Sequence, residues 1–211
     1  MKTVKAFPGK EEDMLVNTFI SAYAMLMSFR SYIYLPLILC ITQFVSALEI
    51  GSTAPYFSLS DSTGKKWNSE DFLNRKHVLV FFYPAAMTGG CTRQVCSYQV
   101  DFAKWNAKGF EIVGISGDKP ENLSLFKKAE NLGFRLLSDW NGKTAKKFGV
   151  PINNGGSIQK FIQGERYTLE RGITAKRWTF IISKTGKVIY KNSKANAGSD
   201  SADAFNFISN L

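Results

Sequence analysis

The sequence is poor in the residues that cross-link small folds or bind metals. Its 211 residues include only three cysteines, Cys40, Cys91 and Cys96, which are too few for a scaffold built on disulfides. His77 is the single histidine, so a multi-histidine metal site is excluded, and two cysteines with one distant histidine do not complete a tetrahedral zinc site. We therefore expect no metal and no other cofactor. The chemistry left to the chain is that of cysteine.

Acidic residues are in the minority. The chain has 27 lysines and arginines against 17 aspartates and glutamates, a formal net charge of +10. The basic residues are spread along the chain, and in "DFAKWNAKGF" (101–110) the lysines fit the solvent face of an amphipathic helix. No nucleic-acid motif accompanies the charge, so nucleic acid is not predicted as a partner. We interpret the basicity as a solubility feature with some affinity for anionic surfaces.

Residues 1–47 differ in character from the rest and are predicted to be a targeting segment, followed by a folded domain at 48–211. The apolar run from Tyr32 to Val45 is too short for an ordinary spanning helix, which needs about 20 residues. Arg30 precedes this run, and the small-x-small sequence "VSA" (45–47) follows it, as in a secretory signal peptide. We expect export to the periplasm or another non-cytosolic compartment, with cleavage at the end of this segment.

Two alternatives stay open for the targeting segment. Translation could begin at Met27, because "MSFRSYIYLPLILC" would form a complete signal by itself. The preceding apolar stretch, "MLVNTFISAYAMLMSF" (14–29), could instead combine with the first into a membrane anchor. The membrane would then be a partner only through this uncleaved segment. Cleavage after Ala47 would discard Cys40 and leave Cys91 and Cys96 as the only cysteines.

Beyond residue 48, apolar runs alternate with helical patterns, which predicts an α/β domain with a central sheet. Two continuous apolar runs, "HVLVFFY" (77–83) and "FEIVGIS" (110–116), indicate strands that are buried on both faces. Apolar spacing predicts a helix from Thr92 to Lys108, closed by Gly109. Further strands are expected at 56–59, 134–139, 177–183 and 186–192, and further helices at 119–133, 141–149 and 199–211. The irregular stretch 152–171 is expected to form a long loop or a hairpin.

Cys91 stands where the apolar run at 77–83 has ended and the predicted helix begins. Backbone N–H groups without carbonyl partners gather at a helix N-terminus, and the helix dipole favours negative charge there. A thiol in this place is expected to ionise more easily than a free cysteine, and the thiolate is the nucleophilic form. The sequence thus predicts that Cys91 is activated by its position.

Small and polar residues precede this cysteine in "PAAMTGGC" (84–91). Gly89 and Gly90 remove side-chain bulk, so that a small substrate or other backbone can approach closely. Thr88 offers a hydroxyl that can hydrogen-bond a thiolate or a bound oxygen. Pro84 fixes the exit of the strand and shields the site from one side.

Cys96 lies five positions beyond Cys91, inside the same predicted helix. In an intact helix their Cα atoms would be about 8.6 Å apart, whereas a disulfide needs about 4.4–6.8 Å and correctly aimed Cβ atoms. The two cysteines therefore cannot bond unless the first turns of the helix open. A structural disulfide is disfavoured, because it would break the helix that carries it.

The chemistry that fits this pair is a two-stage redox cycle. The Cys91 thiolate attacks a peroxide O–O bond and becomes a sulfenic acid, and Cys96 condenses with it after local unwinding. An outside dithiol then reduces the disulfide, and the helix re-forms. The competing interpretation is two ordinary buried cysteines, which suits Cys96 better than it suits Cys91 after "TGG".

The same residues resemble a known family. "PAAMTGGC" fits the P-x-x-x-T-x-x-C active-site pattern of peroxiredoxins, and the spacing of Cys91 and Cys96 is similar to that of the peroxiredoxin Q, or bacterioferritin comigratory protein, branch of the AhpC/TSA superfamily. The similarity covers about residues 50–211 in order. Further matching segments are "GSTAPYFSLSDSTGK", "VGISGD", "LLSD", "FGVP" and "RWTFIISKTGKV".

This resemblance implies a thioredoxin-like fold and a thiol-dependent peroxidase that reduces hydrogen peroxide and organic hydroperoxides. It implies that Cys91 is the peroxidatic cysteine and Cys96 the resolving one, joined in an intramolecular disulfide. It also implies that Pro84 and Thr88 frame the pocket, with Thr88 binding the peroxide. Arg177 would stabilise the thiolate and polarise the peroxide, although the residues alone would make it an ordinary surface arginine. The implied reductant is thioredoxin or a similar dithiol donor, and the implied state is a monomer.

The sequence departs from the family pattern in two places, and two other functions stay open. Gly89 stands where the family often has proline, and the stretch between Val150 and Arg177 is longer than expected and could cover the pocket. A thiol–disulfide oxidoreductase acting on proteins is one alternative, although its expected C-x-x-C is absent. The other is a non-catalytic thioredoxin-like module, against which the retention of both cysteines counts. If the protein is exported, its reductant must be an exported dithiol donor.

Overall fold

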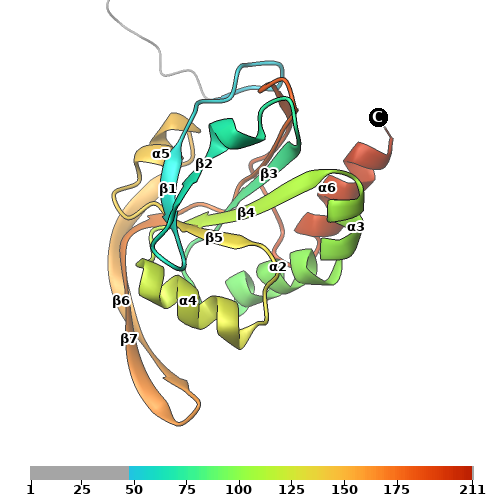
Figure 1. The fold of residues 1–211 in the computed structure, drawn as a ribbon. Coiled ribbons are helices and arrows are strands. Elements are labelled where there is room, and N and C mark those ends of the chain that lie inside the picture. The colour runs from blue at the N-terminus through green and yellow to red at the C-terminus, as the bar shows by residue number, and fades with distance from the viewer. Residues whose placement is uncertain (1–47, 211) are drawn as a thin grey trace, which may run out of the picture. The chain divides into compact units, whose positions relative to one another are not determined.

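The computed structural model describes residues 48–210, so the predicted targeting segment at 1–47 lies outside the described residues. At its centre is a seven-stranded sheet with the strand order β2-β1-β5-β4-β3-β8-β9 (Figure 1). These strands are β1 (Ser58–Asp61), β2 (Lys66–Asn68), β3 (His77–Phe82), β4 (Phe110–Ser116), β5 (Arg135–Ser138), β8 (Thr179–Ile182) and β9 (Val188–Asn192). The pairs β3–β4 and β4–β5 are parallel, and the other pairs in this sheet are antiparallel. The mixed α/β architecture expected from the sequence is confirmed.

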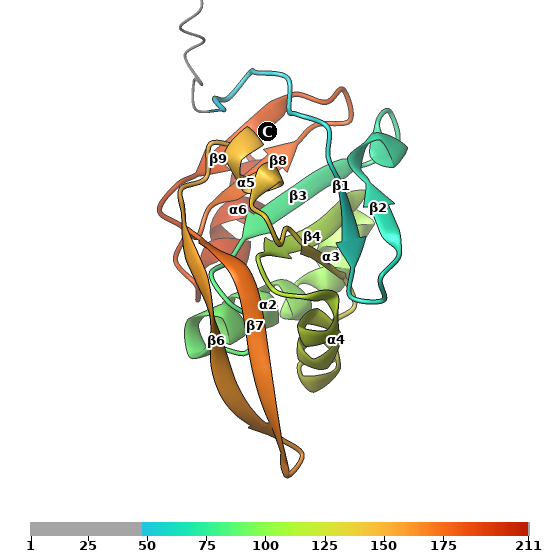
Figure 2. The same cartoon turned by 90° about the vertical axis from the view of Figure 1, so that its left-hand side faces the viewer.

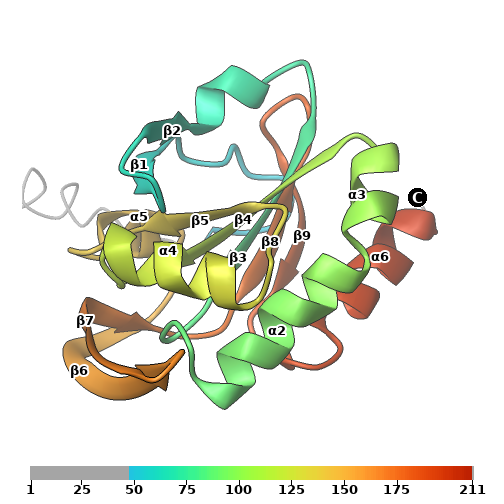
Figure 3. The same ribbon diagram turned by 60° about the horizontal axis from the view of Figure 1, so that its bottom comes forward.

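Helices flank this sheet on both faces. They are the 3-10 helix η1 (Ser69–Phe72) and the α-helices α2 (Gly89–Val100), α3 (Phe102–Ala107), α4 (Pro120–Ala129), α5 (Lys143–Lys147) and α6 (Asp200–Ser209). Figure 3 shows α2, α3 and α6 together on one side of the sheet. Within residues 48–210, no helix combines the length and hydropathy that a membrane crossing requires.

The central strand β3 divides two hydrophobic cores, because successive side chains of a strand point to opposite faces. Val80 and Phe82 join the first core, which also contains Phe148 beside α5. Phe81 joins the second core, where its ring stacks on Tyr98 of α2 with the centroids 4.6 Å apart. The side chains of Val80, Phe81 and Phe82 in β3, and of Tyr98 in α2, are fully buried. Burial on both faces explains why the apolar run of this strand is unbroken. Strand β3 therefore fixes the start of the loop that connects it to α2.

The predicted single helix from Thr92 to Lys108 is wrong in its extent. The structure has α2 and α3 in its place, and α2 begins three residues earlier, at Gly89. The two helices meet at Asp101, whose ψ of 2° departs from helical geometry. The Asp101 carboxylate accepts hydrogen bonds from Lys104 and from Ser201 of α6, each at 2.9 Å. Aspartate competes in this way for local polar partners, which lowers its helix propensity.

The first strand also differs from the prediction at 56–59, since β1 begins at Ser58. The backbone of Phe57 is already occupied by the start of η1. Its N–H donates to the hydroxyl of Ser69, and its carbonyl accepts from the Ser69 N–H, both at 3.0 Å. Pairing with β2 can therefore start only after this residue.

The irregular stretch forms a hairpin, one of the two forms expected for it. Its strands β6 (Ile152–Ile162) and β7 (Glu165–Ala175) make a two-stranded sheet of their own. Figure 2 shows this hairpin extending beyond the main sheet. Gln163 and Gly164 connect the strands with φ values of 52° and 88°, and positive φ at both residues suits a two-residue hairpin turn.

The base of the hairpin is fixed to the domain by close backbone contacts. The Gly172 N–H donates to the Gly117 carbonyl at 2.9 Å, and Ile173 and Ala175 are buried in the first core. Cys91 belongs to the second core, on the other face of the sheet. The apolar anchorage of the hairpin is therefore separate from the packing of this cysteine.

Substituting Gly172 with alanine should destabilise the fold by about 1–3 kcal/mol, because the added Cβ would lie 2.1 Å from the Trp140 carbonyl oxygen. Gly156→Ala is the matched control in the same hairpin, since its Cβ would meet nothing closer than an Arg171 nitrogen at 3.6 Å. Urea unfolding of both variants measures the difference. Equal stabilities for the two would contradict the tight anchorage at Gly172.

Candidate active site

Cys91 is the third residue of α2 and lies in the first turn of that helix. The first bond along the helix axis runs from the Thr92 N–H to the Thr88 carbonyl at 2.8 Å. The N–H groups before it have no carbonyl one turn back, and they carry the positive end of the helix dipole. The Cys91 side chain is 1% exposed, so little water screens this field. The predicted position at a strand–helix junction is thus confirmed.

Arg177 meets this cysteine from a distant part of the sequence. Its Nη2 lies 3.5 Å from the Cys91 Sγ. The approach follows from the sheet, because β8 pairs antiparallel with β3 and the Phe82 N–H donates to the Trp178 carbonyl at 2.8 Å. The start of β8 therefore lies beside the end of β3, and Arg177 comes directly before it. The structure brings together the cation and the thiol that the resemblance had paired.

Gly90 lies beside the Arg177 guanidinium. A Cβ on this residue would lie 3.4 Å from the Arg177 Nη2, which is ordinary van der Waals contact. A Cβ on Gly89 would meet no atom within 4 Å. Crowding therefore forces neither glycine, and the departure from proline at the first is not explained by it.

Thr88 and Pro84 belong to the loop between β3 and α2. Thr88 is the N-cap of α2, and its hydroxyl donates to the Ala85 carbonyl at 2.9 Å. Its proton is engaged within the loop, and its oxygen lone pairs remain able to accept a hydrogen bond. Pro84 is half-buried and follows β3 by two positions.

Asp118, a buried carboxylate that sequence reasoning missed, is hydrogen-bonded to this loop. Asp118 is 1% exposed, and its Oδ2 accepts from the Ala86 N–H and the Ser116 hydroxyl, both at 2.8 Å. Burial raises the pKa of Asp118, and these two hydrogen bonds oppose the rise. Asp118 follows β4, which runs parallel to β3, and side chains after neighbouring parallel strands meet at one edge of a sheet. That topology is the signal that could have identified it.

Cys96 lies further along α2 and has a different partner from Cys91. Its thiol donates to the Glu130 Oε2 at 3.4 Å. Burial, with the hydrogen bond and the charge of Glu130, raises the pKa of the Cys96 thiol above its ordinary value of 9.0. Both cysteines are free thiols on one continuous helix. The pair is therefore separated in the wound state, as the spacing predicted.

Gln94 was also missed by sequence reasoning. It is fully buried between the two cysteines on α2, and its Oε1 accepts a hydrogen bond from the Arg177 Nη1. Arg177 thus binds one residue of the helix through each of its terminal nitrogens. No local motif marks such a glutamine, because its partner lies 83 positions away.

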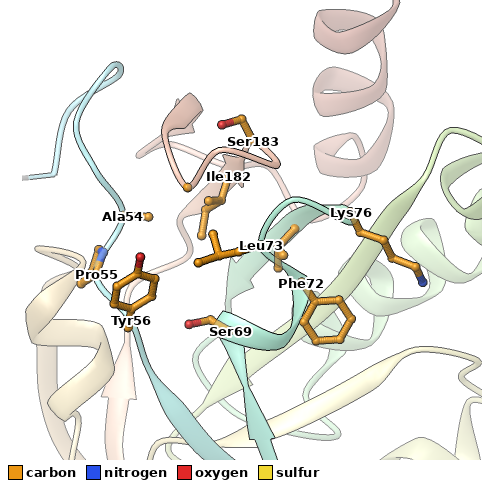
Figure 4. A pocket seen from close by; sticks show the side chains of 11 residues that line it. Ala54, Pro55, Tyr56, Ser69, Phe72, Leu73, Lys76, Ile182 and Ser183 are labelled. Carbon is orange, nitrogen blue, oxygen red and sulfur yellow. The ribbon is translucent and has the colours of Figure 1, made fainter.

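Other features of the domain do not contribute to this site. Within residues 48–210, no group of three or more histidine, cysteine, aspartate or glutamate side chains could hold a metal ion. An apolar pocket, seen in Figure 4 with Tyr56 and Leu73 on its wall, is also lined by Val78 and Ile182. These last two lie near the start of β3 and at the end of antiparallel β8. The pocket is therefore at the opposite end of the sheet from the loop that carries Cys91.

Comparisons with known proteins agree with this geometry. A profile of the AhpC/TSA family matches residues 50–191. Peroxiredoxin Bcp of Escherichia coli (strain K12) is 40% identical over 144 residues, which cover 68% of this chain and 85% of that protein. The chloroplastic peroxiredoxin Q of Sedum lineare is 37% identical over 144 residues, covering 67% and 68%.

Solved structures confirm the predicted thioredoxin-like fold. The crystal structure of peroxidoxin BcpB from Mycobacterium tuberculosis matches with a TM-score of 0.65 at 28% identity, over 78% of this chain and 98% of that one. A buried thiol in the first turn of a helix, a facing arginine and relatives that are themselves peroxiredoxins lead to one assignment. The chain belongs to the AhpC/TSA family, in its peroxiredoxin Q and Bcp branch, and is a thiol peroxidase.

Proposed function

We propose that the protein reduces hydrogen peroxide and small organic hydroperoxides with Cys91 as the peroxidatic and Cys96 as the resolving cysteine. The observation that carries this proposal is the 3.5 Å approach of the Arg177 Nη2 to the Cys91 Sγ, in the first turn of α2. A permanent cation and a helix N-terminus both favour the thiolate. The same guanidinium can donate to an oxygen of the bound peroxide.

In the first step, the Cys91 thiolate attacks one peroxide oxygen, and the O–O bond breaks. Sulfur is oxidised to the sulfenic acid, and the other oxygen leaves as hydroxide or alkoxide, which takes up a proton. Arg177 stabilises the negative charge that develops on the leaving oxygen. Thr88, as a hydrogen-bond acceptor, and Pro84 position the substrate at the mouth of the site.

In the second step, α2 unwinds locally and brings Cys96 to Cys91. The Cys96 sulfur attacks the sulfenic sulfur, a disulfide forms, and water leaves with the Cys96 proton and the sulfenic hydroxyl. An external dithiol then reduces this bond and is itself oxidised to a disulfide. Thioredoxin or a similar dithiol protein is the reductant we propose, acting on a monomer.

Counting thiols after one equivalent of hydrogen peroxide tests the function directly. The reduced domain should lose both free thiols within seconds and form the Cys91–Cys96 disulfide, which mass spectrometry of the peptides identifies. Persistence of both thiols, with reduction of insulin disulfides instead, would support a thiol–disulfide oxidoreductase. Persistence without either activity would support a non-catalytic module.

Glu130→Gln should shift the pH dependence of disulfide formation. The raised thiol pKa of Cys96 means that the wound helix keeps its full stability below about pH 9, and that this stability falls as pH rises through the raised pKa. Opening of α2, and with it disulfide formation, should therefore accelerate in alkaline solution. Replacing Glu130 removes the charge and weakens the acceptor, which brings the pKa of Cys96 in the wound helix closer to its ordinary value. The alkaline acceleration should therefore be smaller and should level off at lower pH.

Stopped-flow measurement of the step that follows sulfenic acid formation, between pH 7 and pH 10.5, gives this profile. Glu121→Gln is the matched control, because Glu121 is an exposed acidic residue on α4, the helix that Glu130 caps at its C-terminus. Superimposable profiles for the Glu130 variant and the wild type would count against a role of this carboxylate in holding Cys96.

We also propose that the protein is exported from the cytosol. The signal-like pattern at 30–47 supports export, with an exported dithiol donor as the reductant. Sequencing the N-terminus of the mature protein tests this. A start at Leu48 supports cleavage, whereas an intact leader in the membrane fraction supports anchoring.

A further inference from the structure

A buried carboxylate is connected to the arginine of the site through the side chain of Gln94. Asp200 is the first residue of α6 and is fully buried. Its Oδ2 accepts three hydrogen bonds, from Gln94 Nε2 at 2.7 Å, from the Tyr98 hydroxyl at 2.8 Å and from the Thr179 hydroxyl at 2.7 Å. The other oxygen, Oδ1, is buried without a hydrogen-bond partner within residues 48–210, and a buried charge left partly unbonded is costly. A carboxylate kept at such cost, and bonded to a residue that contacts Arg177, is a candidate for a role in the reaction.

Gln94 connects this carboxylate to Arg177. Its amide nitrogen donates to Asp200, and its carbonyl oxygen accepts from the Arg177 Nη1. A carboxylate accepts only, and a guanidinium donates only, so this pair of neighbours allows one orientation of the amide. The other guanidinium nitrogen, Nη2, lies 3.5 Å from the Cys91 Sγ. A continuous chain of hydrogen bonds thus runs from Asp200 to the thiol.

The charges of these hydrogen-bonded groups also favour an effect of Asp200 on Arg177. Burial raises the pKa of Asp200, while its three hydrogen bonds and the positive charge of Arg177 oppose that rise. The groups that lower the pKa are those that benefit from a negative charge at this position. Because charge-assisted hydrogen bonds are stronger than neutral ones, an ionised Asp200 holds Gln94 more firmly than a neutral acceptor would.

We propose that Asp200 is a positioning residue of the peroxidase reaction, which acts through Gln94 to hold the Arg177 guanidinium against the Cys91 sulfur. The inference rests on the proposed function of Cys91 and Arg177 and assigns the C-terminal helix α6 a part in it. Asp200 does not touch the peroxide or the sulfur. Its effect is to restrict the conformations of the Arg177 side chain, whose planar guanidinium must face both the peroxide and the sulfur.

The rate constant for oxidation of Cys91 by hydrogen peroxide, measured at equal folded fraction, tests this role. Asp200→Ala should lower it about tenfold, the usual effect of losing one charged hydrogen bond. Asp200→Asn should recover it to within about threefold of the wild type, because its carbonyl oxygen can accept the same three bonds. Asp203→Asn is the control, since Asp203 is an exposed acidic residue on the same helix.

A purely structural role of Asp200 gives a different result. It would lower the unfolding temperature but leave the rate constant and its pH dependence unchanged in the folded fraction, and that outcome overturns the proposal. The pH dependence of Cys91 alkylation provides the second readout. In the Ala variant we expect the thiolate to appear at higher pH, and in the Asn variant near the wild-type position.

Gln94→Met keeps the test decisive if Asp200→Ala does not fold. It removes both bonds of the connecting amide with little change in volume, and it should slow Cys91 oxidation about tenfold or more. A Gln94→Met variant that oxidises as fast as the wild type at equal folded fraction would overturn the link from Asp200 to Arg177. If the wild type itself fails to oxidise at Cys91, the proposed function fails as well. A normal wild type with unaffected Asp200 and Gln94 variants refutes this inference alone.

Discussion

Replacing Cys91 with serine should lower the peroxide reductase rate by about a thousandfold or more, because a hydroxyl cannot replace the thiolate as the nucleophile. The substitution changes one atom in a side chain that is 1% exposed, so the second core should retain its packing. Peroxide consumption with a dithiol donor measures the loss. After one equivalent of hydrogen peroxide, the Cys96 thiol of this variant should remain free.

Cys96→Ser separates the two steps of the cycle. This variant keeps Cys91 and its contact with Arg177, so Cys91 should still react with the first equivalent of peroxide. The reaction should stop at the sulfenic acid, which dimedone can trap, and a second equivalent should drive it to the sulfinic acid. Sustained turnover by the Cys96 variant with the same reductant would contradict the role of Cys96 as the resolving cysteine.

Local sequence patterns predicted the parts of this site that are close together in the chain. The unbroken apolar run of β3 and the five-residue spacing of Cys91 and Cys96 on one helix are local, and the structure places them as expected. The glycines before Cys91 are local too, but they lie inside α2 and not before it. Apolar periodicity predicted the ends of helices less reliably where a side chain has a partner in another element. Asp101 ends α2 because its carboxylate binds Ser201 of α6, a contact that no local pattern indicates.

The residues around the thiol that come from elsewhere could not be predicted from the residues alone. Arg177 reaches Cys91 only because β8 pairs antiparallel with β3, and family resemblance was the sole indication of it. Asp118 and Asp200 were missed, because an acidic residue at the end of a strand or the start of a helix usually faces solvent. Their burial becomes evident only when the hydrogen-bond donors around them are known.

Substituting Arg177 with methionine should slow oxidation of Cys91 by about a hundredfold or more, the usual effect of removing one preorganised donor from a site of developing charge. Methionine fills much of the same volume but carries no charge and donates no hydrogen bond. Arg177→Lys should lose about tenfold, because an ammonium keeps the charge without the planar pair of donors that reaches both Gln94 and Cys91. The second-order rate constant with hydrogen peroxide measures both variants.

Arg93→Met distinguishes a specific contact from a general positive field. Arg93 is exposed on α2 only two positions after Cys91, so its loss removes one positive charge from the helix that carries Cys91. Surface charges are screened by water and salt, whereas the buried Cys91 sulfur is 3.5 Å from the Arg177 Nη2. We therefore expect Arg93→Met to stay within about twofold of the wild type at 0.15 M salt. Similar losses in the Arg93 and Arg177 variants would show that net charge, and not this contact, activates the thiol.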